Sequence, residues 1–204
     1  MKKSEQTKER ILKAAARILS EKGFQETRTA ELAAEAGLSE GAIFRYFPTK
    51  SNLIEAVVRF LIGELHSELS TVLQDAEGLN EIETLEMIID FHYGFFSWRG
   101  GIVQNLLVAS HAKRADVPIQ LLVQEGLMPY ISKIKSLLES GMNKGIFRRG
   151  DSSLMATALL GLMQIIILRK LVMGADYSFA DAKAEVKQIF FSGILLQRGE
   201  QDAQ

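Results

Sequence analysis

The sequence contains no cysteine, and this absence removes several classes of site at once. Without thiolates the chain forms no disulfide framework, no cysteine-ligated zinc or iron–sulfur centre and no cysteine nucleophile. The composition fits a reducing compartment, and we expect a cytoplasmic protein. The basic residues near the N-terminus precede an amphipathic stretch rather than an uninterrupted apolar one, so no secretory signal is expected.

Long hydrophobic runs and a large charge of one sign are also missing. The longest mostly apolar segment, residues 154–168, has 15 residues and contains Gln164. It falls short of the ~20 residues that span a bilayer, so we expect no membrane partner. A formal net charge of −1 argues against coating nucleic acid by bulk charge. Residues 1–60, however, hold 11 basic against 8 acidic residues, which places any polyanionic partner at the N-terminal third.

Proline is scarce, with 3 residues, and no segment alternates apolar with polar residues as a strand does. Almost every segment instead carries apolar residues at helical spacing. The sequence therefore predicts an all-α protein of about nine helices. A small domain of three helices over residues 1–49 is expected to join a larger helical bundle over residues 50–204.

Glycine and capping residues set the expected helix ends. Gly23 ends the first helix, and the second runs from Thr29 as N-cap to a left-handed turn at Gly37. Ser39 caps a third helix, which Pro48 closes. Further N-caps are expected at Thr49, at Asn80 with Glu83, at Asp151 and at Ser178. Helices are expected to break at residues 99–101 and 143–150 and to kink at Pro129. The last helix is expected to run to about Gln197.

Residues 29–47 fit a helix-turn-helix, in which two short helices pack on an amphipathic first helix and present one helix to the DNA major groove. Ile43 and Phe47 lie four residues apart and face inward with Leu38. Arg45 faces outward, and its fork of donors matches the two acceptors of guanine. The outward face consists of Glu40, Gly41, Phe44 and Arg45.

Contacts to the DNA backbone are expected beside this face. Tyr46 and Lys50 are candidates to touch phosphates. Thr29 is a third candidate, together with the backbone amides at the start of its helix, because a helix N-terminus binds anions.

The run GLSEGAIFRYFPTK, residues 37–50, follows TAELA at residues 29–33 and resembles strongly the DNA-binding signature of TetR-family transcriptional regulators. The resemblance implies a homodimer that binds a double-stranded operator through its N-terminal helices and a ligand through the remaining ones. Two residues depart from the family: Phe44 stands where Tyr is common, and Glu40 would repel phosphate unless it accepts from a cytosine amine. By position, the implied DNA contacts are Thr29, Glu40, Gly41, Ala42, Phe44, Arg45, Tyr46 and Lys50.

Catalytic and metal-binding interpretations find little support. Residues 37–41 match G-x-S-x-G, but that nucleophile elbow needs a preceding strand, and a helix is expected there. Asp90 and His92 are two apart and point in different directions on a helix. The carboxylate pairs Glu64 with Glu68 and Glu86 with Asp90 lack the Glu-x-x-His motif of helical metal sites. We expect no enzyme, no metal and no cofactor.

Aromatic residues gather between residues 91 and 98, a pattern that most often belongs to a core. A helical bundle can also enclose an apolar cavity with a few polar groups, and the resemblance implies such a pocket. The expected effector is small and largely hydrophobic. The candidate ligand-binding residues are Phe91, His92, Phe95, Trp98, Gln104, His111, Met128 and Gln164.

The segment from residue 152 to 173 is apolar nearly all round, so it must be covered on both sides. Its own domain covers one side, and a second copy packed through the last two helices would cover the other. The function expected is a ligand-responsive regulator, a repressor that its effector releases from a palindromic operator. The alternative is a helical small-molecule carrier or enzyme with a vestigial DNA-binding surface.

Overall fold

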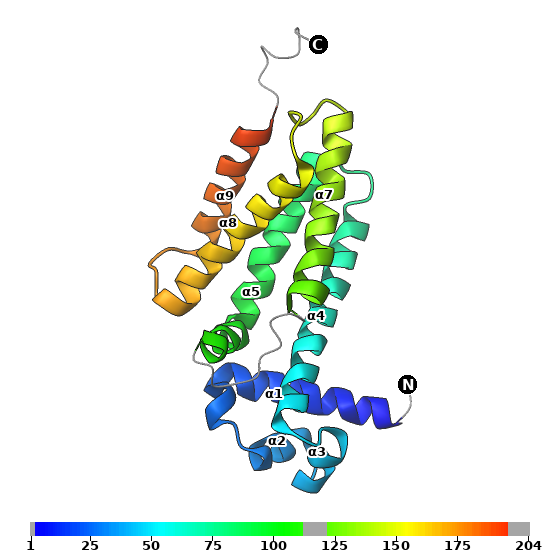
Figure 1. Cartoon of the computed structure of the whole chain (residues 1–204), viewed down its shortest axis with the longest axis vertical. Coiled ribbons are helices and arrows are strands. Elements are labelled where there is room, and N and C mark those ends of the chain that lie inside the picture. The colour runs from blue at the N-terminus through cyan, green and yellow to red at the C-terminus, as the bar shows by residue number, and fades with distance from the viewer. Residues whose placement is uncertain (1–2, 112–121, 196–204) are drawn as a thin grey trace. The chain divides into compact units, whose positions relative to one another are not determined.

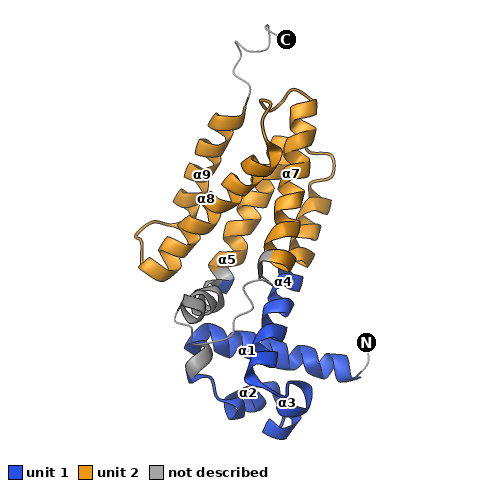
Figure 2. Ribbon diagram, in the orientation of Figure 1, with its two compact units in different colours: residues 1–65, 98–123 blue, residues 66–97, 124–204 orange. Residues whose placement is uncertain are grey.

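The computed structural model describes residues 3–111 and 122–195, and its regular elements in these ranges are helices (Figure 1). Apart from helices, the described residues form one isolated antiparallel bridge between Phe147 and Leu195. The chain divides into two units, Met1–Leu65 with Trp98–Val123 and His66–Ser97 with Gln124–Gln204 (Figure 2). The expected all-α fold is confirmed.

The first unit is built on α1 (Lys3–Glu26), α2 (Thr29–Ala36), α3 (Glu40–Tyr46) and the first turns of α4 (Lys50–Asp75). One apolar core joins these helices, because each contributes residues at helical spacing to the same cluster. α1 also holds α2 by polar contacts: the Arg10 guanidinium donates to the carbonyl of Ala36, and Arg17 pairs with Glu35. Fully buried members of the core include Ile11, Ala15, Ile43, Val57 and Val58.

The local signals in this unit act largely as expected. Gly23 leaves helical geometry at φ 77°, and Gly37 ends α2 in the left-handed region at φ 64°, where glycine is least strained. The Ser39 hydroxyl accepts from the amide of Ala42 at 3.3 Å and caps α3. The assignment of Thr29 as N-cap is wrong: Arg28 holds that position without a side-chain bond, and Thr29 is the first helical residue.

The second unit contains the end of α4, the first part of α5 (Glu81–His111), α7 (Met128–Asn143), α8 (Ser152–Met173) and α9 (Phe179–Ile194). Its centre is apolar, with Leu85, Ile89, Ile134, Leu159 and Met163 fully buried. α7 packs along α8, and α8 along α9. Salt bridges from Lys187 to Asp90, at 2.8 Å, and to Glu86 at 3.9 Å join α9 to α5.

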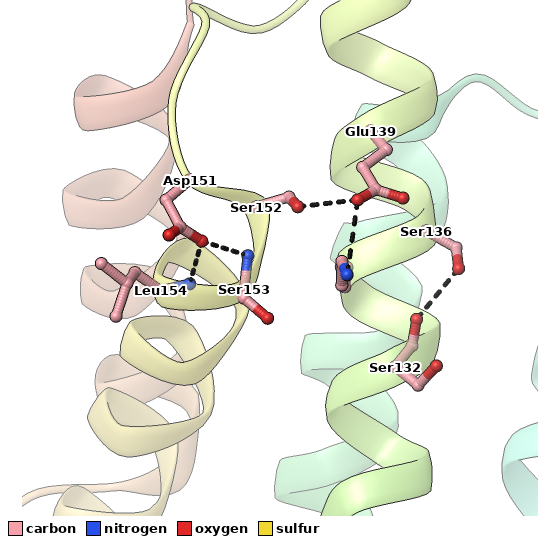
Figure 3. Close-up of polar contacts among 8 residues, drawn as sticks. Ser132, Ser136, Glu139, Asp151, Ser152, Ser153 and Leu154 are labelled. Atoms are coloured by element: carbon pink, nitrogen blue, oxygen red, sulfur yellow. Dashed lines mark hydrogen bonds and ion pairs between the residues drawn. The ribbon is translucent and has the colours of Figure 1, made fainter.

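Capping in the second unit also follows the sequence. Asn80 and Glu83 form a reciprocal capping box, each side chain accepting from the other residue's amide at 3.0 Å. Figure 3 shows the start of α8, where the Asp151 carboxylate accepts from the amides of Ser153 at 2.9 Å and Leu154 at 3.0 Å. These caps satisfy amide groups that have no partner within their own helices.

Three helix boundaries differ from expectation. Gly100 and Gly101 do not break the chain, because α5 continues to His111. A glycine lowers helix stability by about 1 kcal/mol relative to alanine, a preference too small to decide by itself where a helix ends. Pro129 lies in the first turn of α7 after a short π-helix, Leu122–Leu127, so it begins a helix rather than kinking one. α9 ends at Ile194, because Leu195 is extended and pairs with Phe147.

α8 has one buried side and one exposed apolar side. Met155, Leu159 and Met163 are buried, whereas Leu154 and Ile165 are 68% and 48% exposed. By length and composition α8 could cross a membrane, and a third of its most apolar window is buried within the protein. The core helices of soluble proteins meet the same two criteria, so these criteria alone do not make α8 a membrane span.

Candidate functional site

The helix-turn-helix is set by local chemistry at the α2–α3 junction. After Gly37 reverses the chain, the Leu38 amide donates to the carbonyl of Ala33 at 2.8 Å, and Ser39 begins α3. Ile43 and Phe47 are 1% and 4% exposed and fix α3 on the core. This anchoring leaves the opposite side of α3 free to meet a partner.

The outward side of α3 carries the residues that the sequence placed there. Glu40, Gly41 and Arg45 are exposed, and Phe44 is 48% exposed. The exposed part of the Phe44 ring gives this side of α3 apolar area that a partner can cover. Ala42 is half-buried at the edge of the same side. Glu40 lies in the first turn of α3, where a carboxylate stabilises the helix.

A hollow lies beside Phe44 at the point where two helix N-termini meet. Its lining includes Thr27 and Thr29 at the start of α2, and Thr49 and Lys50 at the start of α4. Apolar side chains of the first unit's core form its floor. Hydroxyl groups, a lysine and the free amides of two helix starts are the donors that bind phosphate oxygens.

Sequence reasoning named Thr29, Phe44 and Lys50, and the structure brings these three to one hollow. It did not name Thr27 or Thr49 as part of the site. Thr49 was recognised only as the cap of the next helix, and its hydroxyl does accept from the amide of Asn52 at 3.1 Å. The position of Thr27 just before a helix start could have marked it as a candidate contact. Its burial, however, depends on the packing of the whole unit and cannot be inferred from neighbouring residues.

The cations of the first unit divide by role. On α1, Lys22 pairs with Glu31 of α2 at 3.1 Å, and Lys13 pairs with Glu9 of the same helix at 2.7 Å. Among the described residues no ion pair is recorded for Arg28, Arg45 or Lys50, and all three are exposed. The Lys50 ammonium donates to the carbonyl of Thr27 at 3.4 Å, which directs the lysine across the hollow. Arg28, Arg45 and Lys50 therefore place three positive charges within and beside the helix-turn-helix.

Tyr46 ties α3 to the start of α1. Hydrogen bonds with Ser4, and secondarily with Thr7, lower the pKa of its phenol, and the Arg45 guanidinium lies 5.7 Å from its ring centre. The contact orients Arg45 along the end of α3. Tyr46 thus has a structural contact in addition to the phosphate contact that the sequence predicts.

The predicted ligand-binding residues are only partly grouped. Phe91 and Phe95 contact each other, with ring centres 5.8 Å apart, and His92 contacts Phe96 at 4.8 Å and Tyr130 at 5.6 Å. Gln164 is half-buried on α8, and Met128 is 48% exposed at the start of α7. The side chains of Trp98, Gln104 and His111 lie outside those that the structure describes.

His92 is the polar exception in this aromatic cluster. Its ring is 2% exposed, and in the part of the chain that the structure describes neither ring nitrogen has a hydrogen-bond partner. Burial lowers the pKa of His92 to about 3, so the ring is neutral at pH 7. The Tyr93 hydroxyl is also buried without a partner, and burial raises its pKa.

Three of the four carboxylates considered as metal ligands pair with a lysine or arginine. Glu86 and Asp90 pair with Lys187, and Glu64 pairs with Arg99 at 3.3 Å. Within residues 3–111 and 122–195, no group of three His, Asp or Glu side chains is placed to hold a metal ion.

Comparison with known proteins agrees with this geometry. Residues 11–57 match the family model described as bacterial regulatory proteins, tetR family. The nucleoid occlusion factor SlmA of Pectobacterium carotovorum is 29% identical over 169 residues, which cover 79% of this chain and 81% of the relative.

Solved structures share the whole fold. A TetR transcriptional regulator from Chloroflexus aurantiacus superposes with a TM-score of 0.79 at 18% identity, covering 97% of this chain and 100% of that one. The transcriptional regulator FadR from Bacillus subtilis, in complex with stearoyl-CoA, gives a TM-score of 0.74 at 18% identity, covering 90% of this chain and 97% of that one. At these identities the likeness concerns the fold.

Proposed function

Because the chain belongs to the tetR family of bacterial regulatory proteins, a family of DNA-binding regulators, we propose that it is a ligand-responsive repressor that binds a palindromic operator as a cytoplasmic homodimer. The strongest support for this proposal is the arrangement of groups around α3. The outward side of α3, with Phe44 and Arg45 exposed, lies beside a hollow whose lining includes Thr29 and the ammonium group of Lys50. A recognition helix flanked by phosphate-binding groups is the geometry that docks into the major groove.

The DNA contacts divide into base readout and backbone positioning. Arg45 reads a guanine, and the ring of Phe44 packs on a thymine methyl group. Lys50, Thr29 and Tyr46 contact phosphates and hold the helix in register. The remaining contacts come from residues near the groove side of α3, namely Gly41 and Ala42, which allow close approach, and Glu40, which accepts from a cytosine amine.

Dimerisation uses the exposed apolar side of α8 together with α9. Leu154, Ile165 and Val172 follow one side of α8, and Ile189 is 50% exposed on α9. A Cβ atom added at Gly161 would meet no side chain, so a partner helix can approach there. A second copy buries this surface and gives the two-fold symmetry that a palindrome requires.

The proposal also assigns residues 1–49 to DNA binding and residues 50–204 to ligand binding and dimerisation.

The effector acts by shifting a population. It binds the conformation with mis-spaced recognition helices more tightly than the DNA-bound one, since equal affinity would change nothing. FadR was solved with stearoyl-CoA, which shows that this fold accommodates a ligand with a long apolar part. The buried aromatic residues around His92 favour a small, largely hydrophobic effector here. Phe91, Phe95, Trp98, Gln104, His111, Met128 and Gln164 remain candidate contacts to it.

The test is selection from a random duplex DNA pool with the purified full chain at a stated salt concentration, because protein–DNA affinity depends steeply on salt. We expect recovery of a palindrome with half-sites about one helical turn apart, or a multiple of it. Absence of any enriched sequence, from protein stripped of co-purified small molecules, would refute the proposal.

Two variants then separate readout from positioning. Arg45→Ala should lose about 1–3 kcal/mol on the selected site and relax base preference there, whereas Lys50→Ala should weaken all sequences alike and lower the salt slope by about one. Fluorescence anisotropy with the selected and a scrambled duplex measures both effects. Unchanged sequence preference in Arg45→Ala would remove α3 from the role of recognition helix.

The relatives named nucleoid occlusion factors favour a second candidate function. A nucleoid occlusion factor keeps cell division away from the chromosome, so deletion of its gene should produce septa over DNA. A repressor predicts instead increased transcripts from genes beside its binding sites. Transcript profiling and microscopy of the same deletion strain distinguish the two functions.

A further inference from the structure

His92 lies in the second unit with two hydrogen-bonding atoms that no group among the described residues satisfies. Its ring is surrounded by Tyr93 at 6.2 Å, Phe96 at 4.8 Å and Tyr130 at 5.6 Å between ring centres. Both Nδ1 and Nε2 are buried without a partner. Buried polar groups are nearly always hydrogen-bonded, so a histidine left open on both sides indicates a missing partner.

The neighbouring hydroxyl groups repeat this pattern. The Tyr93 hydroxyl has no partner, and the Tyr130 hydroxyl reaches only the carbonyl of Ile88, at 3.5 Å. Ile88 precedes His92 by one helical turn, so the Tyr130 hydroxyl and the His92 ring lie beside the same part of α5. His92 and Tyr130 thus place unused hydrogen-bonding capacity side by side in an otherwise apolar core, and Tyr93 adds a third such group next to His92 along α5.

We infer that His92 and Tyr130 bind an uncharged group of the effector that both donates and accepts hydrogen bonds, such as a hydroxyl or an amide on an apolar body. This inference rests on the proposed ligand response and names the chemistry of its ligand.

The chemistry of His92 selects a neutral group over a charged one. A neutral imidazole offers one N–H donor and one acceptor, which match a hydroxyl or amide at the two nitrogens. The ring contacts that surround it are aromatic and supply no counter-charge. A carboxylate or ammonium group placed there would remain unpaired in a region of low dielectric, which is strongly unfavourable.

The same arrangement predicts an unusual stability effect. Replacing an unpaired buried polar residue by an apolar one of similar volume removes a desolvation penalty. His92→Leu should therefore raise the Tm of the ligand-free protein by about 2–6 °C. A histidine that serves only the fold would instead lower the Tm when replaced. His92→Gln keeps a donor and an acceptor and serves as the variant that retains binding.

The direct test uses four probes of one size: benzyl alcohol, benzamide, benzoate and toluene. The full chain is labelled with ¹⁵N-histidine. Because the sequence has 3 histidines, His92→Leu and a control, His66→Gln, assign the ring signals. We expect the alcohol and the amide to shift both ring nitrogens of His92. We also expect His92→Leu to lower the preference for benzyl alcohol over toluene by about fivefold to tenfold, and His66→Gln to leave it unchanged.

Three results would overturn the inference: ring signals that no probe shifts, a preference unchanged in His92→Leu, or tightest binding by benzoate with proton uptake. Ring signals that no probe shifts would mean that His92 bonds only to water. The DNA selection is independent of the probes. A recovered palindrome with an inert His92 refutes only this inference, whereas probe binding without DNA binding refutes the repressor and leaves the ligand site standing.

Discussion

Disrupting the exposed side of α8 should separate the dimer and thereby abolish operator binding. The change is Ile165→Glu, at a side chain that is 48% exposed in the single chain. Fully burying an isoleucine contributes about 1.5–3 kcal/mol, so covering the exposed half contributes about 1 kcal/mol. In a symmetric dimer the same residue is buried twice, which gives roughly 2 kcal/mol per interface.

The glutamate adds a second penalty to this loss. Each carboxylate is desolvated against the apolar residues of the partner, at several kcal/mol per ion when no cation pairs with it. The expected total exceeds about 4 kcal/mol, and each 1.4 kcal/mol is a factor of ten, so the dimer Kd should rise by roughly a thousandfold. The folded monomer should be unaffected, because the core side of α8, with Leu159 and Met163, is unchanged.

Sedimentation velocity over a range of concentrations measures this shift, with circular dichroism to check folding. Ser70→Glu on α4 is the matched control, since it adds one negative charge at an exposed polar position. Operator affinity should fall in parallel with dimerisation, because each half-site then binds alone. A folded Ile165→Glu protein that stays dimeric would refute the assignment of this surface.

Two further predictions concern the stability of the second unit. Gly141→Ala should destabilise the fold by about 2–4 kcal/mol, because the added Cβ would overlap the ring of Phe147, and thermal melts of this variant with and without Phe147→Leu should show partial rescue. Lys144 and Ser140 each donate a hydrogen bond of 2.6 Å to the Glu81 carboxylate, and these bonds lower the pKa of Glu81 in the folded protein. The stability that Glu81 contributes is therefore fully present above its unfolded pKa, near 4.5, and is lost as the pH falls through the lower folded pKa. Urea midpoints of Glu81→Gln should therefore lie below wild type at pH 7 and converge with it in strong acid; a constant difference would contradict the role of Glu81.

The features predicted well from sequence are those decided within a few residues. Ser39 capping α3 and Gly37 ending α2 depend on backbone groups three or four positions away, so their residue types are sufficient evidence. The inward side of α3 followed equally well from the spacing of Ile43 and Phe47.

The features that sequence missed depend on distant parts of the chain. Glycines at positions 100 and 101 indicated a break by propensity, but α5 passes through them. The ion pair between Glu81 and Lys144 joins residues far apart in sequence, and no local pattern announces it. Thr27 and Lys50 reach the same hollow from two helix starts that only the packed core brings together.

Three exposed or unsatisfied features have a common physical meaning. Phe44 leaves half of an aromatic ring in solvent, the outer side of α8 leaves Leu154 and Ile165 uncovered, and His92 leaves two nitrogens unbonded. Each lowers the stability of the isolated chain relative to an ordinary surface or core residue, and local rules are broken mainly where a protein meets its partners. The three partners proposed here differ in chemistry, since DNA meets the first, a second copy the second and a neutral ligand the third. Coupling among ligand, dimer and operator further requires that each partner bind one conformation of the chain more tightly than another, as the proposed effector does when it favours mis-spaced recognition helices.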